Sequence, residues 1–482
     1  MIYLEENLLT KFLKLMSKDI SESDLELVPL GRSLGLDLIS FSELRASQED
    51  DFIDRVRKEA LNRLAKCNDN VVGNNYSFYA GSIDFMVSND PESKKFYLLE
   101  TNGGSNRGLS ILTKKQQALL YEGYYESISQ AIERVKGENG KVLVLIGVPI
   151  NDGLIHEKVI MVEYLRKKIK SKGYSLKIFN SDNYDKEHKA KVVFVISDYE
   201  QLSQTLSFSN GWIWYLGKRV NVLIGDGIAR RFHDKKFHEL ILKDFRHIRT
   251  IIVNPIFKIT DDKSLTYVVG FLSKNVLKKY NMKHLFFTKA YNENELILKA
   301  KYLIKNYKKS FIIKPSGGSG GAGVIPILKD EKPERIKKII EESKKEFYVK
   351  FSKKRDPFPY TIQEKADFSL INWEGGKHTF DLRIYLAQSE NKVVPIGGLA
   401  RIARGTFIKG LNKQEFVVNL SGYDGKIEVN RGVGFSEKSS RILELSFEDF
   451  VNAFCIGSVV FKNIVENYNK IMKFSDWDKI IS

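Results

Sequence analysis

A glycine-rich segment with a lysine at its start is the clearest candidate for chemistry in this sequence. The run KKSFIIKPSGGSGGAGVIPI ends an apolar stretch in Lys314 and Pro315, and five glycines follow between positions 317 and 323. Because glycine has no Cβ, several backbone N–H groups of such a loop can approach one anion, and the lysine adds positive charge. The pattern predicts a phosphate-binding loop made of Lys314, Ser316, Gly317, Gly318, Ser319, Gly320 and Gly321.

Three well-known kinds of glycine-rich loop fit this segment poorly. Gly318, Gly320 and Gly323 match GxGxxG, but VIPI with Pro326 predicts a second strand where a dinucleotide site needs a helix. No Gly-Lys pair is followed by Ser or Thr, as a Walker A loop requires, and the HRD and DFG motifs of protein kinases are absent. An ordinary glycine-rich hairpin remains the alternative.

A second candidate site lies in GSIDFMVSNDPESKKFYLLETNGGSNRG. Side chains alternate along a strand, so Glu100 and Asn102 share one face, and Asp84 on the partner strand can join them. Mg²⁺ prefers one or two carboxylates, with water and substrate phosphate in the remaining positions. The set therefore predicts a nucleotide-associated magnesium site, with solvated acidic residues on a hairpin as the alternative.

The elements around these motifs follow from their periodicity. EDDFIDRVRKEALNRLAK places apolar residues at helical spacing, which predicts a helix with Ser47 as its N-cap. YAGSIDFMVS and KKFYLLETN predict a hairpin, and the strand and helix patterns alternate from residue 141, as in an open, mostly parallel sheet. A helix is expected near the end, in FVNAFCIGSVVFKNIVENYNKIM. The fold class is α/β with α+β portions.

The charge distribution argues against a nucleic-acid partner. The chain has 77 Lys and Arg against 60 Asp and Glu, a net charge of +17. Residues 1–140 carry 17 basic and 22 acidic residues, net −5, so the remainder carries 60 against 38, net +22. Many of the lysines lie in amphipathic stretches such as ERIKKIIEESKKEF, where Lys and Glu share a solvated face, and a phosphate-rich ligand can use the remaining positive charge.

Cysteine usage and hydropathy indicate a cytoplasmic protein without a membrane partner. Cys67 and Cys455 are the only cysteines, which excludes a disulfide framework and zinc sites built from CxxC pairs. The longest apolar runs, such as VLVLIGVPI, are far shorter than the roughly 18 residues of a membrane-spanning helix.

Taken together, the two motifs resemble those of the ATP-grasp superfamily, in which a KPxxGSGGxGV hairpin covers the ATP phosphates and strands ending in ExN hold magnesium. Here the metal strands come first, at 81–102, and the glycine loop follows at 314–323. This order is similar to the circularly permuted arrangement of eukaryotic-type glutathione synthetases and related ligases. The resemblance covers nearly the whole chain.

The resemblance implies a circularly permuted ATP-grasp fold with an inserted, Rossmann-like pre-ATP-grasp domain. Residues 1–140 would form an N-terminal helical region plus the magnesium-binding strands, and residues 141–260 the inserted domain. Residues 261–440 would form the nucleotide-binding region, and residues 441–482 a C-terminal helical segment.

It also implies roles for further residues. Lys263, about 50 residues before Lys314, matches the family's first ATP lysine, and YTIQEKAD matches its adenine hinge. Glu364 would face the adenine amino group, with backbone contacts from Lys365 to Asp367. The strand TFDLRIYLAQ and the later ARIARG are similar to family segments that bring arginines to the reacting phosphate. The implied residues are Arg383 and Arg401 for catalysis, Arg107 and Asn419 for the substrate, and Asp84, Glu100, Asn102 and Asp381 for the metal.

Two departures from the family pattern leave questions open. The glycine loop carries no acidic metal ligand, so either Asp84 or Asp381 would complete the metal site. Ser82 stands where some ATP-grasp ligases have an arginine before the metal aspartate, so stabilisation of the developing oxyanion would depend on Arg383 or Arg401.

The function implied is an ATP-dependent carboxylate–amine ligase that forms an amide or peptide bond through an acyl phosphate and releases ADP and phosphate. Its cofactors would be ATP and two Mg²⁺ ions, and its substrates an amino acid or a peptide-like carboxylate and amine. It could act as a homodimer. The alternatives are a small-molecule kinase on the same fold and a regulatory protein that binds ATP without turnover.

Overall fold

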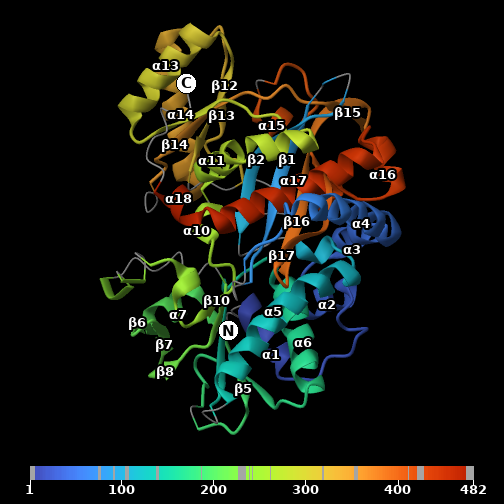
Figure 1. Ribbon diagram of the computed structural model, residues 1–482, viewed down its shortest axis with the longest axis vertical. Helices are drawn as coiled ribbons and strands as arrows, with labels where there is room; N and C mark the ends of the chain where they lie inside the picture. The colour runs from blue at the N-terminus through green and yellow to red at the C-terminus, as the bar shows by residue number, and fades with distance from the viewer. Residues whose placement is uncertain are drawn as a thin grey trace, which may run out of the picture.

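The structure is a computed structural model of the 482-residue chain. It describes residues 6–73, 78–88, 90, 93–103, 108–136, 140–185, 187–225, 235–237, 239–240, 243–260, 262–316, 320–351, 356–410, 412–420 and 428–473. The fold is mixed α/β, with two antiparallel sheets in the upper half of Figure 1 and a parallel sheet in the lower half.

The largest sheet carries most of the candidate site residues. Its strand order is β18-β17-β16-β1-β2, with β15 paired to β16, and all pairs are antiparallel. Its register shifts between Asp84 and Phe85, which pair with Glu100 and Leu98, so Leu99 is an extra residue in β2. Its strands are β1 (Ala80–Val87), β2 (Phe96–Gly103), β15 (Leu370–Trp373), β16 (Gly376–Ser389), β17 (Lys392–Ile402) and β18 (Gly432–Gly434).

One face of this sheet is closed by helices. α17 (Phe447–Glu466) runs across it in Figure 1 and is buried along most of its length, because apolar residues occur on nearly every side of the helix. α4 (Asp50–Cys67) packs beside it with Phe52, Val56 and Leu64. With this face apolar, the polar residues Asp84 and Asp381 lie on the opposite face of the same strands.

The parallel sheet has the order β10-β9-β3-β5-β4. Its central strand β3 (Val142–Val148) is buried throughout, as expected for a strand covered on both faces. α5 and α6 share one apolar core with it, and that core also includes Tyr385 and Ala387 of the large sheet. The members outside β3 are β4 (Leu176–Asn180), β5 (Val192–Asp198), β9 (Val222–Ile224), β10 (Ile251–Ile252), α5 (Lys114–Arg134) and α6 (Ile155–Ser171).

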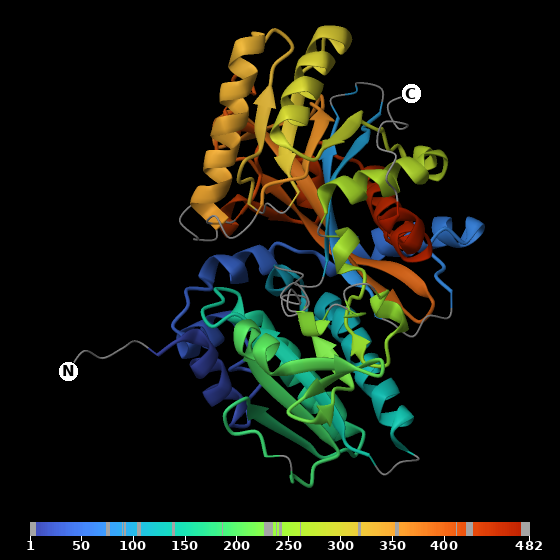
Figure 2. The same ribbon diagram turned by 90° about the vertical axis from the view of Figure 1, so that its left-hand side faces the viewer.

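A four-stranded antiparallel sheet presents the glycine loop. Its order is β11-β14-β12-β13, and the chain between β12 and β13 is the glycine-rich segment. α13 and α14 cover its outer face, at the upper left of Figure 2, with Leu303 and Ile340 in the shared core. The elements are β11 (Phe287–Ala290), β12 (Phe311–Pro315), β13 (Ile325–Ile327), β14 (Tyr360–Glu364), α13 (Glu293–Tyr307) and α14 (Pro333–Phe351).

The remaining described elements are short or peripheral. The helices are α1 (Leu8–Met16), α2 (Leu27–Leu34), α3 (Ile39–Ala46), α7 (Tyr199–Thr205), α10 (Phe257–Thr260), α11 (Lys263–Leu272), α12 (Lys274–Leu277), α15 (Lys413–Phe416), α16 (Glu437–Ile442) and α18 (Tyr468–Met472). Short 3₁₀ turns are η1 (Leu109–Ile111), η3 (Lys235–Phe237), η4 (Phe245–His247), η5 (Lys278–Tyr280) and η6 (Val429–Arg431). A small antiparallel sheet consists of β6 (Leu206–Ser209), β7 (Trp212–Tyr215) and β8 (Lys218–Arg219).

The helices and strands predicted from periodicity are present, but one cap was predicted wrongly. Glu49, not Ser47, precedes α4. Ser47 instead ends α3: its N–H donates to the carbonyl oxygen of Glu43, and its hydroxyl donates to that of Leu44 at 2.7 Å. Within the part of the chain that the structure describes, no helix combines the length and apolar character needed to cross a membrane.

Candidate active site

Lys314 is the residue around which the candidate site is organised. It lies near the end of β12 and is only 8% exposed. Its Nζ donates to the hydroxyl of Tyr267 at 2.8 Å and to Oε1 of Gln363 at 2.6 Å. Both partners are neutral, so these contacts hold the ammonium group in place without compensating its charge.

Burial therefore sets the protonation of Lys314. Desolvation, and then the nearby charge of Lys263, lower the pKa of Lys314 to about 7, with Glu100 opposing them. Lys263 is the first residue of α11, and its Nζ lies 2.8 Å from Oε2 of Glu100. One buried and one half-buried lysine next to a single carboxylate leave positive charge that an anionic ligand can neutralise.

Sequence reasoning missed a second buried lysine, on the same sheet face as Lys314. Lys289 in β11 is opposite Thr361 in β14, and Thr361 is opposite Lys314 in β12, so the three side chains share a face. Lys289 Nζ lies 3.7 Å from a carboxylate oxygen of Asp262, and burial lowers the pKa of Lys289. The period-two spacing of Phe287 and Lys289 in FFTKA was the available signal.

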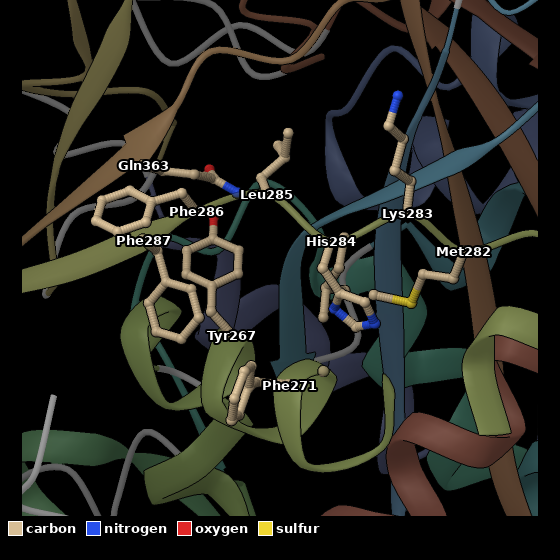
Figure 3. A pocket seen from close by; sticks show the side chains of 11 residues that line it. Tyr267, Phe271, Met282, Lys283, His284, Leu285, Phe286, Phe287 and Gln363 are labelled. Carbon is tan, nitrogen blue, oxygen red and sulfur yellow. The ribbon is translucent and has the colours of Figure 1, made fainter. Parts of the chain in front are cut away.

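A cavity of about 180 Å³ lies beside these groups, between β2, α11 and the segment that leads into β11. In Figure 3 the Tyr267 hydroxyl and the Gln363 amide lie close together above the ring of Phe271. Both residues also contact Lys314. The cavity is mainly apolar with a few converging polar groups, which is the composition of a small-molecule site. Its lining is Leu98, Tyr267, Gly270, Phe271, Met282, Lys283, His284, Leu285, Phe286, Phe287 and Gln363.

The expected adenine hinge lies at the end of β14, next to Gln363. Oε1 of Glu364 accepts a hydrogen bond from Lys309 Nζ at 2.6 Å, and the backbone N–H of Glu364 donates to the carbonyl oxygen of Phe286. The backbone N–H of Lys365 donates to the carbonyl oxygen of Ser310 at 2.8 Å, and Asp367 is exposed. In this arrangement Glu364 faces a lysine, and the N–H groups of residues 364 and 365 already have acceptors.

The glycine loop is described at its two ends. The backbone N–H of Ser316 donates to Pro359, and the buried Ser316 hydroxyl has no partner among the described residues. Gly320 and Gly321 have φ of +64° and +72°, the left-handed region that favours glycine. A Cβ on Gly320 would lie 2.2 Å from Lys350 Nζ and 2.9 Å from Asn419 Nδ2, so another residue here would have to move these two side chains. Gly317, Gly318, Ser319 and Arg107 lie outside the described residues.

Asn419 lies on the other side of this loop end. With Gly320 it lines a shallow cavity of about 20 Å³ whose other members include three cations. Arg404 and Arg431 both pair with Glu428, and Lys413 lies 2.6 Å from Glu346. The structure thus places the expected substrate residue Asn419 beside the glycine loop in basic surroundings.

The expected catalytic and metal residues form one buried charge network on the large sheet. Arg383 donates from Nε and Nη2 to the two oxygens of Asp84, both at 2.7 Å. Arg401 donates from Nη2 to Asp84 at 2.8 Å and from Nε to Asp381 at 2.8 Å, with a second Nη2 contact to Asp381. Burial would raise the pKa of Asp84, but Arg383 and Arg401 outweigh it and hold the pKa below its ordinary value.

Glu100 connects this network to the lysines. It contacts Lys263 directly, and its charge acts on Lys314 and on Arg401. Asn102 Nδ2 donates to Asp84 at 3.3 Å. Over the described ranges, no group of three or more His, Cys, Asp or Glu side chains is arranged to hold a metal ion. The two expected lysines, the expected arginines and the expected metal residues therefore lie together in one band of charge, whereas the hinge residues follow Gln363 at the end of β14 and Asn419 lies beside the glycine loop.

Comparisons with known proteins give weak matches only. No protein-family model matches the sequence, and no curated protein matches it. A gamma-glutamylcysteine synthetase candidate from Methylobacillus flagellatus KT has 11% identity and a TM-score of 0.42, covering 90% of this chain and 96% of its own. A glutathione synthetase-like effector from Globodera pallida has 14% identity and a TM-score of 0.35, covering 76% and 81%.

A D-alanyl-alanine synthetase A from Vibrio cholerae O1 biovar eltor has 9% identity and a TM-score of 0.27, covering 68% of this chain and 99% of its own. All three TM-scores are below 0.5, so these matches establish no shared family. The activities named for the matched proteins are therefore statements about those proteins and not about this chain.

Proposed function

We propose that this chain is an ATP-dependent carboxylate–amine ligase with a circularly permuted ATP-grasp architecture. In this proposal residues 141–260 form a Rossmann-like pre-ATP-grasp domain, and the protein acts in the cytoplasm on small amino-acid or peptide-like substrates. The observation that carries it is the continuous band of buried and half-buried charge from Lys314 through Lys263 and Glu100 to Asp84, Arg383 and Arg401.

This band of charge suits a reaction that needs charge neutralisation rather than acid–base catalysis. A carboxylate is a poor electrophile, so its oxygen first takes the γ-phosphoryl group of ATP, which gives an acyl phosphate and ADP. An amine then attacks the acyl carbon, phosphate leaves, and an amide forms. Positioning and electrostatic stabilisation account for most of the catalysis in such transfers, and lysines, arginines and glycine N–H groups supply both.

The residues fit a triphosphate better than they fit the full metal set. Lys314, Lys263 and the glycine loop would hold phosphate, and the cavity beside Gln363 would take the flat adenine ring. Glu100 and Asn102 supply oxygen ligands of the kind that Mg²⁺ prefers, and a bound Mg²⁺ would neutralise phosphate charge. Asp84 and Asp381 fit less well as ligands in this arrangement, because two guanidinium groups already neutralise both carboxylates.

The test is ADP release from ATP with amino acids and short peptides offered in pairs. ADP and phosphate that require both a carboxylate and an amine would support the ligase. ADP with a stable phosphorylated acceptor would indicate a kinase instead, and tight ATP binding without any turnover would indicate a regulatory protein.

Arg401→Ala offers a sharper test of the mechanism. The lysines and the loop would hold the ground-state triphosphate, whereas the arginines would meet charge that develops at the carboxylate end. The variant should therefore lose about a hundredfold or more in turnover rate with a smaller change in ATP affinity. An unchanged rate in both Arg401→Ala and Arg383→Ala, with verified substrates, would refute this mechanism.

A further inference from the structure

Asp84 is placed as an acceptor for two arginines. It is 0% exposed and lies in β1, directly opposite Arg383 of β16. Its Oδ1 accepts a hydrogen bond from Nε of Arg383, and its Oδ2 accepts from Nη2 of Arg383 and from Nη2 of Arg401. Asn102 adds a weaker donor to Oδ2 at 3.3 Å. Four N–H groups therefore converge on one carboxylate.

This arrangement conflicts with a role for Asp84 as a metal ligand. A Mg²⁺ ligand must offer an oxygen lone pair at about 2.0–2.1 Å in near-octahedral geometry. Oδ2 already has three donors, so coordination there would displace at least one guanidinium group, whereas Oδ1 has one donor and a Mg²⁺ ion bound to it would lie beside two guanidinium cations. Among the described residues Arg383 has no carboxylate partner other than Asp84, so displacing it would leave a largely buried cation unpaired, which is strongly unfavourable.

Asp381 completes the network from the other side. It pairs with Arg401 in register across β16 and β17, and the Arg401 guanidinium binds both of its oxygens. With both aspartates ionised, the two arginines and two aspartates sum to zero charge. Each guanidinium group donates from Nε and Nη2 in these contacts. No described residue accepts a hydrogen bond from Nη1 of either arginine.

We propose that Asp84 is a positioning residue that fixes Arg383 and Arg401 side by side, leaving one nitrogen of each for an anionic group, and that it does not ligate the metal. The identity of that anion rests on the proposed function, whereas the pairing of Asp84 with the two arginines does not. Glu100 and Asn102 then remain as the protein's metal ligands.

The first experiment measures metal binding without requiring turnover. Mn²⁺ would be titrated into the ADP complex and followed by electron paramagnetic resonance, for the wild type, Asp84→Asn and Glu100→Gln. We expect Asp84→Asn to lose clearly less Mn²⁺ affinity than Glu100→Gln, which removes a ligand charge and should lose about tenfold or more. Loss of Mn²⁺ in Asp84→Asn equal to that in Glu100→Gln, with unchanged circular dichroism, would overturn the proposal.

The second experiment observes the arginine side chains directly, and its first measurement needs no nucleotide. A side-chain N–H held in a buried, charge-assisted hydrogen bond exchanges slowly with water. In ¹⁵N-labelled wild-type protein, the Nε–H signals of Arg383 and Arg401, assigned with Arg383→Lys and Arg401→Lys, should persist at about pH 8. Rapid exchange of the Arg383 signal, or its loss on addition of Mg²⁺ and ADP, would contradict the assignment.

The two arms separate this inference from the proposed function. If ADP and Mn²⁺ fail to bind the wild type, the proposed function fails, and the exchange measurement still decides the role of Asp84. In Asp84→Asn the Arg383 signal should be lost while the Arg401 signal, anchored by Asp381, persists. Two unchanged signals would show that Asp84 positions neither arginine.

Discussion

The pKa of the buried Lys314 side chain should make nucleotide binding depend on pH. Its two hydrogen-bond partners are neutral, and its pKa is lowered to about 7 by burial and by Lys263. A bound polyphosphate would place negative charge next to it and return the pKa toward its ordinary value. The affinity and the proton balance of binding should both reflect this residue.

Lys314→Met should weaken ATP binding by about tenfold or more, because the charge that faces the phosphates in a partly dry site is lost while the aliphatic stem is kept. Isothermal calorimetry measures the effect. Lys301→Met, at an exposed position of α13, is the matched control and should bind ATP as the wild type does. Equal ATP affinities for all three proteins would show that Lys314 is not part of the nucleotide site.

Nucleotide binding should also take up protons above neutral pH. With a pKa of about 7, Lys314 is mostly neutral at about pH 8 and mostly charged at about pH 6, so uptake approaches one proton per ATP only at the higher pH. Binding heats measured in buffers of different ionisation enthalpy give this number. The uptake should vanish in Lys314→Met, and equal uptake at both pH values would contradict the argument.

At the scale of elements, α3, η1 and α6 are joined by a buried polar contact that sequence reasoning did not find. Oε1 of Glu157 in α6 accepts from the backbone N–H of Ser110 at 2.9 Å and from its hydroxyl at 3.0 Å. Arg45 Nε in α3 donates to the Ser110 carbonyl oxygen at 2.8 Å. Burial raises the pKa of Glu157 to about 7, with the Ser110 hydrogen bonds opposing it.

This raised pKa predicts a pH dependence of stability with a definite sign. Between about pH 4.5 and pH 7 the folded state binds more protons at Glu157 than the unfolded state, so the contribution to stability is lost as the pH rises through 7. Glu157→Gln should remove this loss, on the order of 3 kcal/mol. Urea unfolding near pH 5 and pH 8 measures it, and the exposed Glu334→Gln should behave as the wild type.

The local sequence pattern was enough to predict the helices and strands. It did not predict which distant strands pair, or in which register. The alternation in YAGSIDFMVS and the apolar run of β3 report neighbours that are close in sequence, and both strands are present. The contact of Asp84 with Arg383 joins residues about 300 positions apart, and only the pairing of β1 with β16 brings them together. Sequence spacing alone therefore grouped Asp84 with Glu100 and Asn102 and did not reveal its contacts with the two arginines.

The same reason explains the residues that were missed. Tyr267 and Gln363 appear in the sequence as ordinary members of a helix and a strand, and their common contact with Lys314 depends on how α11 packs against β12 and β14. Lys289 could have been found from its strand alternation, whereas Glu157 is an inward-facing acidic residue in a helix that otherwise carries many charges.

At the scale of the whole molecule, the parallel sheet and the large antiparallel sheet share one apolar core. The core that contains β3, α5 and α6 also contains Tyr385, Ala387 and Leu399 of β16 and β17. Neither sheet can lose its packing without exposing apolar surface of the other. We therefore expect the two halves to unfold together rather than in separate steps.

Leu165→Ala tests this coupling, because Leu165 is fully buried in α6, in the core shared by the two sheets. The substitution should cost about 2–5 kcal/mol of stability. Native-state hydrogen exchange read by mass spectrometry should show lost protection in β16 as well as in β3. Loss confined to β3, with β16 at wild-type protection, would mean that the two sheets are independent.

The extra residue in β2 has a consequence for how this stretch of the gene can vary. The backbone carbonyl of Leu99 accepts a hydrogen bond from the Tyr267 hydroxyl, whose oxygen in turn takes the Lys314 ammonium. Deleting one codon here would let Glu100 follow Leu98 directly and keep its pairing with Asp84, so the strand itself would survive. The deletion would remove the backbone carbonyl of residue 99, an acceptor that any amino acid at this position provides. Position 99 should therefore tolerate many apolar replacements in descendants of this gene, yet not tolerate being lost.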